Sequence, residues 1–149
     1  MTRFVIRKFN KLSVKELFLI YQLRSKVFVV EQNCAYQDVD EKDLLSTHVL
    51  LFDKKTLSAY ARIISPLFSH QLPAIGRVVV DSNYRGKKYG YLIMNKCIAY
   101  CKKNYNGADV IISAQLYLVK FYENLGFKKV GKAYLEDNIP HIKMKLIFS

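Results

Sequence analysis

The sequence predicts an α/β fold in which helices flank one mixed sheet. Apolar residues repeat with a helical period in some stretches and alternate, or run continuously, in others. The resulting order is strand, helix, three or four strands, helix, strand, helix and two strands. A chain of 149 residues, 51% of them hydrophobic, has the usual size of one domain, 1–149, and can bury a substantial core.

The first helix has a clear start. Ser13 is followed three places on by Glu16, which is the spacing of a capping box. Apolar residues then recur at helical spacing until about residues 31–32. On this helix we expect Arg24 and Lys26 to face water.

The rest of the chain reads as strands and two further helices. The strand at 74–80 ends in a continuous apolar run, which suggests burial on both faces. Gly107 and Gly126 mark the ends of the two helices, since glycine readily adopts the left-handed conformation found there. We predict strands over 3–9, 48–52, 57–64, 74–80, 109–114, 127–131 and 141–147, helices over about 88–104 and 115–125, a hairpin turn at 53–56 and a connection at 134–140.

An acidic stretch, residues 31–43, interrupts a basic protein. It is either a solvated loop or a binding surface for a cationic acceptor. In the second interpretation Tyr36, Asp38 and Asp40 contact the substrate, and the loop from Glu136 to His141 could flank the same amine.

The net charge of +12 narrows the partners to nucleic acid, an anionic membrane surface or an anionic cofactor. No apolar run is long enough to cross a bilayer, and the N-terminus lacks the pattern of a signal peptide, so we expect no membrane association. Three cysteines cannot all pair, which favours reduced thiols and a cytoplasmic location. Cys97 and Cys101 suit core packing better than a metal site. The sequence leaves a homodimer open.

Residues 78–90 predict an anion site, because a β-branched strand leads through a basic loop into a helix. The first amides of a helix have no partner within it, so a phosphate can accept hydrogen bonds from them. Gly86 and Gly90 permit close approach of the ligand, and Arg85, Lys87 and Lys88 add positive charge. A pyrophosphate fits this pattern best. The alternative is a solvated basic turn without a ligand.

The same loop resembles the acyl-CoA-binding motif of the GNAT superfamily of N-acyltransferases, [QR]-x-x-G-x-[GA]. Arg85 takes the first place and Gly90 the last, but Lys88 stands at the inner glycine. If that position needs a positive φ, lysine costs about 1 kcal/mol or more. Residues 121–127 resemble the GNAT segment F-Y-x-x-x-G-F, and residues 24–43, 113–115 and 136–144 are similar to the ElaA-like branch.

The resemblance implies a mostly antiparallel central sheet that splays open between two strands. It also implies transfer of an acetyl group from acetyl-CoA, the cosubstrate, to a primary amine by direct attack in a ternary complex. The strand backbone would hold the pantetheine arm, and Tyr122 would be the general acid. By position, the cofactor-binding residues would be Val78, Val79, Val80, Arg85, Gly86, Lys87, Lys88, Tyr89, Gly90, Gln115 and Tyr122.

The general base is the least defined part. Many GNATs have a glutamate on the strand that here spans 74–80, and this strand has none. The candidates are Glu31, His48 and His141. Two other functions stay open: a CoA-binding regulator without catalysis, and a basic nucleic-acid-binding module. Scattered basic residues and the absence of a known nucleic-acid motif disfavour the module. The acceptor could be a protein terminus, a lysine, a polyamine or a small metabolite.

Overall fold

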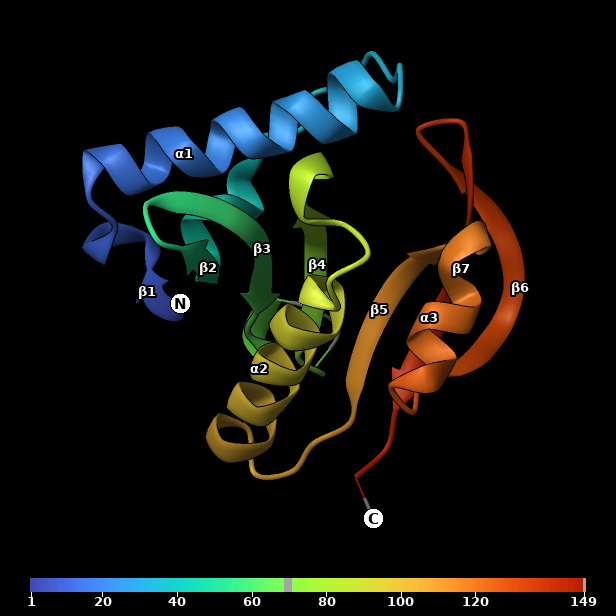
Figure 1. Cartoon of the computed structure of the whole chain (residues 1–149). Coiled ribbons are helices and arrows are strands. Elements are labelled where there is room, and N and C mark those ends of the chain that lie inside the picture. The colour runs from blue at the N-terminus through green and yellow to red at the C-terminus, as the bar shows by residue number, and fades with distance from the viewer. Residues whose placement is uncertain (69–70, 149) are drawn as a thin grey trace.

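The computed structural model describes residues 1–68 and 71–148. In this part of the chain the strands form one seven-stranded sheet in the order β1-β2-β3-β4-β5-β7-β6 (Figure 1). The strands are β1 (Thr2–Lys8), β2 (Ser46–Asp53), β3 (Thr56–Ile64), β4 (Ala74–Val80), β5 (Val110–Gln115), β6 (Lys128–Glu136) and β7 (Ile139–Leu146).

The helices confirm the predicted element order. α1 continues directly into a π-helical stretch, η2, so the helical segment ends at Glu31, close to the predicted end. The Ser13 hydroxyl accepts a hydrogen bond from the Glu16 amide at 3.0 Å, and the Ser13 amide donates to the Glu16 carboxylate at 2.9 Å, so the capping box is confirmed. The helices are α1 (Val14–Arg24), η2 (Ser25–Glu31), α2 (Tyr89–Asn104) and α3 (Val119–Asn124), with short 3-10 turns η1 (Phe9–Lys11), η3 (Glu41–Leu45), η4 (Pro66–Phe68), η5 (Ser82–Tyr84) and η6 (Leu116–Leu118).

The sheet opens between β4 and β5, as the resemblance predicted. These two strands are the parallel neighbours in an otherwise antiparallel sheet, and a single register pair, Ala74 with Ile111, joins them. The Ile111 amide donates to the Pro73 carbonyl at 3.0 Å, at the same end of the strands. Beyond this point the strands diverge, and the gap between them is visible in Figure 1.

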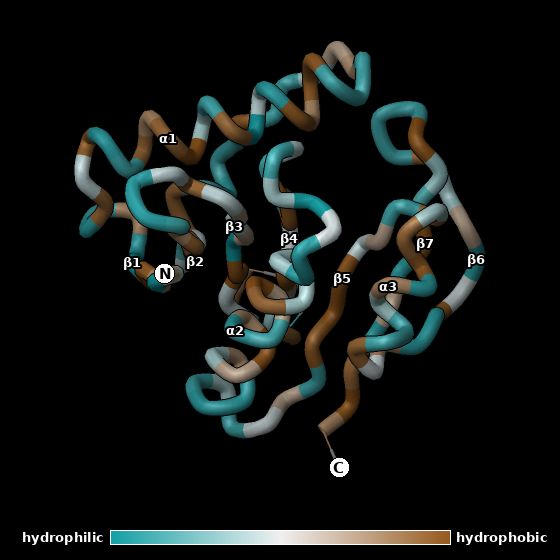
Figure 2. The backbone as a smooth tube through the Cα atoms, viewed as in Figure 1, coloured by the Kyte–Doolittle hydropathy of each residue, from teal (hydrophilic) through white to brown (hydrophobic). Residues whose placement is uncertain are grey.

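Helices cover both faces of the sheet. Successive side chains of a strand point to opposite sides, so a strand contributes residues to the apolar cluster on each face. Leu50 and Tyr60 belong to the apolar cluster under α1, which includes Ile20. Leu51 belongs to the cluster under α2 and α3, which includes Cys97. Figure 2 shows hydrophobic stretches, in brown, along strands such as β5. Within the described residues, no helix is both long and apolar enough to span a membrane.

Two predictions about these elements are wrong. Arg24 is fully buried, because it forms ion pairs with Asp38 and Asp43, whereas Lys26 is exposed as predicted. The predicted connection at 134–140 is mostly strand, because β6 extends to Glu136 and β7 already begins at Ile139. A tight turn at Asp137 and Asn138, with φ of 51° and 62°, suffices to join β6 to β7, since type I′ hairpin turns need two such residues.

Candidate functional site

The gap between β4 and β5 is a cavity of about 410 Å³. Its walls come from η2, β4, β5, α3 and the β6–β7 hairpin. Several residues predicted to bind the cofactor line it, namely Val78, Val79, Val80, Arg85, Gly90, Gln115 and Tyr122. The structure therefore brings together residues from the two segments that carried the family resemblance.

β4 presents free backbone groups to this cavity because a bulge interrupts it. Arg62 pairs with Gly76 and Tyr60 with Val79, so two β4 residues, Arg77 and Val78, lie opposite the single β3 residue between them. Arg77 has a φ of 51°, which is rare for a residue with a side chain. The bulge turns the second half of the strand relative to its neighbour.

The alternation of amides after the bulge shows which ones face the cavity. The Asp81 amide donates to the Ser58 carbonyl at 2.8 Å, toward β3. Successive amides of a strand point to opposite sides, so those of Val80 and Val78 face the cavity and that of Val79 faces β3. No strand pairs with this part of β4 on the cavity side within the described residues.

The basic loop has the backbone expected of an anion site. Gly86 has a φ of 79° and Lys88 a φ of 64°, so the lysine at the inner glycine position does adopt the left-handed conformation. The Leu92 amide makes an early hydrogen bond of α2, to the Lys88 carbonyl at 3.1 Å. The amides before it, including those of Tyr89 and Gly90, have no acceptor within the helix. They lie at the positive end of its dipole.

The side chains of this loop point in different directions. Arg85 forms an ion pair with Glu31 at 2.6 Å and donates to the Val80 carbonyl at 3.2 Å. Lys87 lies over the Tyr84 ring, and the Tyr89 hydroxyl donates to Asp53 at 3.0 Å, outside the cavity. Gly86, Lys87, Lys88 and Tyr89, which were predicted to bind the cofactor, are not among the residues that line the cavity. Their predicted role in binding therefore depends on backbone and net charge.

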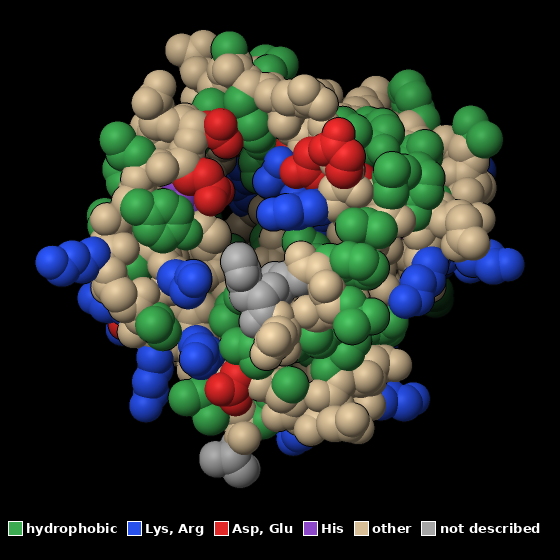
Figure 3. Space-filling view, turned by 180° about the vertical axis from the view of Figure 1, so that it is seen from behind, with side chains coloured by type: hydrophobic (Ala, Val, Ile, Leu, Met, Phe, Trp, Pro, Cys, Tyr) green, Lys and Arg blue, Asp and Glu red, His purple; other side chains and the backbone are tan. Residues whose placement is uncertain are grey.

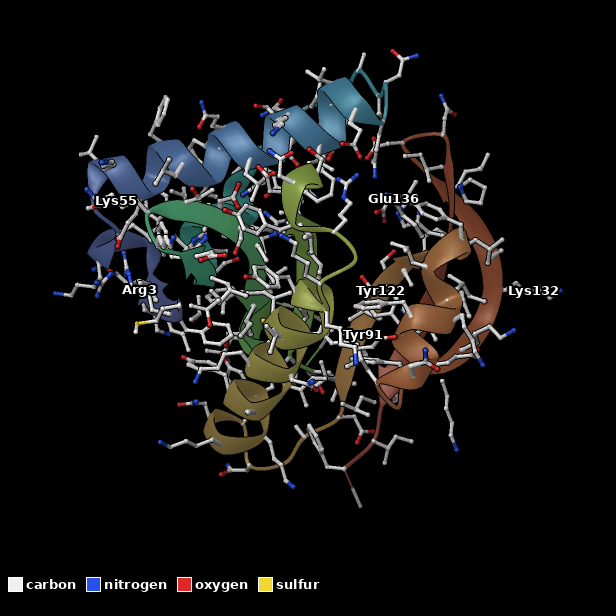
Figure 4. The ribbon with its side chains drawn as sticks, in the orientation of Figure 1. Arg3, Lys55, Tyr91, Tyr122, Lys132 and Glu136 are labelled. Carbon is white, nitrogen blue, oxygen red and sulfur yellow. The ribbon has the colours of Figure 1, made fainter. Side chains whose placement is uncertain are left out.

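Tyr122 lies on the α3 side of the cavity with its side chain 7% exposed. Burial raises the pKa of its phenol, so the group keeps its proton at neutral pH. α3 also leaves little space beside the start of α2, since a Cβ on Gly90 would lie 3.2 Å from two ring atoms of Phe121. Figure 4 shows Tyr122 and Glu136 in the gap between β4 and the β5–β7–β6 part of the sheet.

Most carboxylates of the acidic stretch form ion pairs with the protein's own arginines. Asp38 and Asp40 do not line the cavity. Three arginines and three aspartates form a buried network: Arg24 with Asp38 and Asp43, Arg62 with Asp40 and Asp43, and Arg77 with Asp38 and Asp40. Burial alone would raise the pKa of Asp43 and Asp40, but hydrogen bonds and charges from Arg24 and Arg62 outweigh it and lower both.

Tyr36 remains at the cavity. Its hydroxyl donates to Asp38 at 2.9 Å, and Arg77 lies over its ring at 5.7 Å. Burial and the bond to Asp38 raise the pKa of Tyr36. The arginine network thus holds one wall of the cavity and the strained Arg77 in place.

The three candidate bases lie in different surroundings. His48 is fully buried between the Tyr60 hydroxyl at 2.7 Å and the Asp43 carbonyl at 2.9 Å, outside the cavity lining, and burial lowers its pKa. Glu31 lines the cavity but is paired with Arg85. His141 lines the cavity, 7% exposed.

A polar cluster around His141 contains Glu136, from the loop expected to flank the amine, and two residues without a predicted role, Ser113 and Tyr134. Ser113 of β5 hydrogen-bonds to Tyr134 of β6 and donates to Glu136 at 3.4 Å. The Tyr134 and His141 rings stack at 6.2 Å, because these residues are cross-strand partners. In the described part of the chain, no group of His, Cys, Asp and Glu is placed to hold a metal ion.

The chain resembles known proteins over nearly its whole length. The family model of the acetyltransferase (GNAT) domain matches residues 21–148. A UPF0039 protein of Schizosaccharomyces pombe is 46% identical over 145 residues, covering 96% of this chain and 95% of that one. Protein ElaA of Escherichia coli is 42% identical over 137 residues, covering 91% and 90%.

Solved structures agree with these sequence matches. The crystal structure of an acyl-CoA N-acyltransferase from Pseudomonas aeruginosa matches with a TM-score of 0.92 and 36% identity, and that of Escherichia coli ElaA with 0.91 and 39%; each comparison covers 98% of this chain and 99% of the other. The chain therefore belongs to the GNAT acetyltransferases and is an ElaA-like member of that superfamily.

Proposed function

We propose that the protein transfers an acetyl group from acetyl-CoA to a primary amine by direct attack within a ternary complex. The observation that carries the proposal is the opening of the sheet beside the β4 bulge, where the Val78 and Val80 amides face a cavity also lined by Tyr122. These groups suit acyl transfer, which needs donors for a developing oxyanion and a proton for the departing thiolate.

The diphosphate of the cosubstrate would lie at the start of α2. The unpartnered amides there and the left-handed residues Gly86 and Lys88 form a concave backbone surface, and positive charge from the loop surrounds it. Because Lys87 and Tyr89 contact Tyr84 and Asp53, and Arg85 is paired with Glu31, backbone amides supply most of this binding. The lysine at position 88 is compatible with the site, since it adopts the conformation that the motif requires.

Tyr122 would donate the proton to the thiolate. Its phenol is neutral at pH 7 and has no hydrogen-bond partner among the described residues, so it is free to donate into the cavity. Neither a CoA-binding regulator nor a nucleic-acid-binding module is favoured by a specific observation. The three cysteines are free, which supports a cytoplasmic location as part of the proposal.

The proposal is tested by titrating acetyl-CoA onto the protein in a calorimeter and by screening amines for release of free thiol. Intersecting initial-rate lines support direct attack, whereas parallel lines contradict it and indicate an acyl-enzyme. Tyr122→Phe should lower kcat by about a hundredfold. Tyr91→Phe is the matched control, because its hydroxyl bonds to Asn124 outside the cavity. Equal rates for both variants would exclude Tyr122 as the acid.

The loop is tested by a second pair. Gly90→Val should abolish acetyl-CoA binding, because the valine side chain would collide with Phe121 and displace the start of α2. Lys87→Ala should weaken binding only severalfold, since its ammonium lies over Tyr84. Equal losses in calorimetry would contradict binding through the backbone.

A further inference from the structure

The charges that line the cavity do not balance. Five charged residues line it: Glu31, Arg77, Arg85, Glu136 and Asp137. Arg85 is paired with Glu31 at 2.6 Å. Arg77 is paired with Asp38 at 2.8 Å and with Asp40 at 3.4 Å, inside a network of equal numbers of cations and carboxylates.

Glu136 and Asp137 are left over. Within residues 1–68 and 71–148, no lysine or arginine lies within ion-pair distance of either carboxylate. Both are at the tip of the β6–β7 hairpin, where Cys34 of the opposite wall approaches the Asp137 carbonyl at 3.5 Å. Figure 3 shows the back of the molecule, where acidic side chains lie on two sides of a central hollow. In a protein of net charge +12, this negative charge is local.

His141 is a second, independent feature of the same place. Its Nδ1 lies 2.7 Å from the Ile139 carbonyl, which can only accept, so Nδ1 carries a hydrogen. The neutral ring then has its lone pair on Nε2. That nitrogen makes no hydrogen bond to the described residues and lies 3.6 Å from the Glu136 carboxylate. The side chain is more than nine-tenths buried and lines the cavity.

We infer that the acceptor is a small dicationic amine of the diamine class, held by Glu136 and Asp137, and that His141 takes the proton from its reacting end. This inference rests on the proposed function. An amine arrives as an alkylammonium, which two carboxylates without a lysine or arginine partner attract. A second ammonium on the same molecule satisfies the second carboxylate, which a monoamine leaves unpaired.

The proton balance is complete with these groups. His141 Nε2 removes one proton from the ammonium, and the resulting imidazolium lies beside the Glu136 carboxylate. The amine nitrogen forms a bond to the thioester carbon and the carbon–sulfur bond breaks. The thiolate gains a proton from Tyr122, and the surplus proton on the nitrogen passes through solvent to restore the Tyr122 phenol. The products are an N-acetyl amine, CoA thiol and one proton, which leaves His141 for solvent.

Three acceptors of matched length test the class. Cadaverine, pentylamine and ε-aminocaproate carry a positive, a neutral and a negative far end. We expect kcat/KM for cadaverine to exceed that for pentylamine about tenfold, with ε-aminocaproate lowest, and the differences to shrink with added salt. Equal values for cadaverine and pentylamine would overturn the inference, and so would a preference for ε-aminocaproate, which would indicate recognition by Arg77.

Variants link the preference to the residues. Glu136→Gln with Asp137→Asn should reduce the preference for cadaverine to less than twofold, and asparagine keeps the positive φ of position 137. Glu123→Gln, on exposed α3 outside the cavity, is the matched control and should keep it. His141→Gln should lower kcat about a hundredfold while cadaverine binding changes less than twofold. Loss of both kcat and cadaverine binding would mean that His141 has a structural role.

Binding separates this inference from the proposed function. Cadaverine titrated onto the protein with CoA present reports the carboxylates without turnover. If no amine releases thiol but cadaverine binds and Glu136→Gln abolishes binding, the acyltransferase proposal fails and the cation site stands. If thiol is released and pentylamine binds as tightly as cadaverine, the diamine inference fails and the acyltransferase proposal stands.

Discussion

Replacing Asp43 by asparagine should destabilise the protein by about 3–5 kcal/mol, which is the usual loss when one partner of a buried ion pair is removed. The Asp43 carboxylate is 1% exposed and accepts four hydrogen bonds. Two come from Arg24, at 2.6 and 3.1 Å, one from Arg62 at 2.9 Å and one from the Asp40 amide at 3.1 Å.

The magnitude follows from what the substitution leaves behind. Asparagine has nearly the same volume, so no cavity forms, but its amide group has no charge and donates where the carboxylate accepted. The network then holds three guanidinium groups and two carboxylates. Arg24 is fully buried and cannot turn to water, so it loses a bidentate partner without replacement. Since domains are stable by only about 5–15 kcal/mol, the loss should be conspicuous.

Urea unfolding followed by circular dichroism measures the change. Glu41→Gln, an exposed position in the same 3-10 turn, is the control and should change the free energy of unfolding by less than about 0.5 kcal/mol. Because the network also fixes Arg77 and Tyr36 on the cavity wall, acetyl-CoA binding should weaken together with stability. A loss below about 1 kcal/mol for Asp43→Asn would show that the network behaves like a surface ion pair and would refute this reasoning.

Three further predictions concern backbone strain and pH. Lys88→Gly should raise the free energy of unfolding by about 0.5 kcal/mol in urea titrations, because the relief of strain at φ 64° slightly exceeds the added chain entropy. Gly126→Ala should destabilise more than Gly131→Ala, since both have positive φ but only the Gly126 Cβ would meet Leu146, at 3.0 Å; equal losses in the same titration would contradict this. Burial lowers the pKa of His48 below its ordinary 6.5, so the unfolded chain binds its proton first. The contribution of His48 to the free energy of unfolding is therefore complete above pH 6.5 and is lost as the pH falls through the pKa of His48 in the folded protein. His48→Gln should remove this pH dependence from the midpoints of urea unfolding.

Local signals predicted most of the fold. The capping box at Ser13 and Glu16, the hairpin turn at 53–56 and the left-handed glycine at 126 each depend on residues a few places apart, and each is present. The basic loop before α2 was predictable for the same reason. Its left-handed residues and the start of α2 are encoded within a stretch of a few residues.

Features that depend on distant partners were not predictable. Arg24 on a helix surface reads as solvated until Asp38 and Asp43 are known to fold back on it. Gly76 in β4 is a local sign of a bulge, but the positive φ falls on the next residue, Arg77, whose side chain gives no sign of it. Glu136 and His141 meet only through the register of β6 and β7, which a connection drawn over 134–140 conceals.

The opening of the sheet has a mechanical consequence. Strands β1 to β4 and strands β5 to β7 form two hydrogen-bonded stacks that share a seam at one register pair. The angle between the stacks is consequently set by side chains, foremost the contact of Phe121 with the start of α2, rather than by a ladder of backbone bonds. Repacking a few such side chains can widen or narrow the opening without breaking the hydrogen bonds of either stack, so the size of the cavity can change while the sheet stays intact.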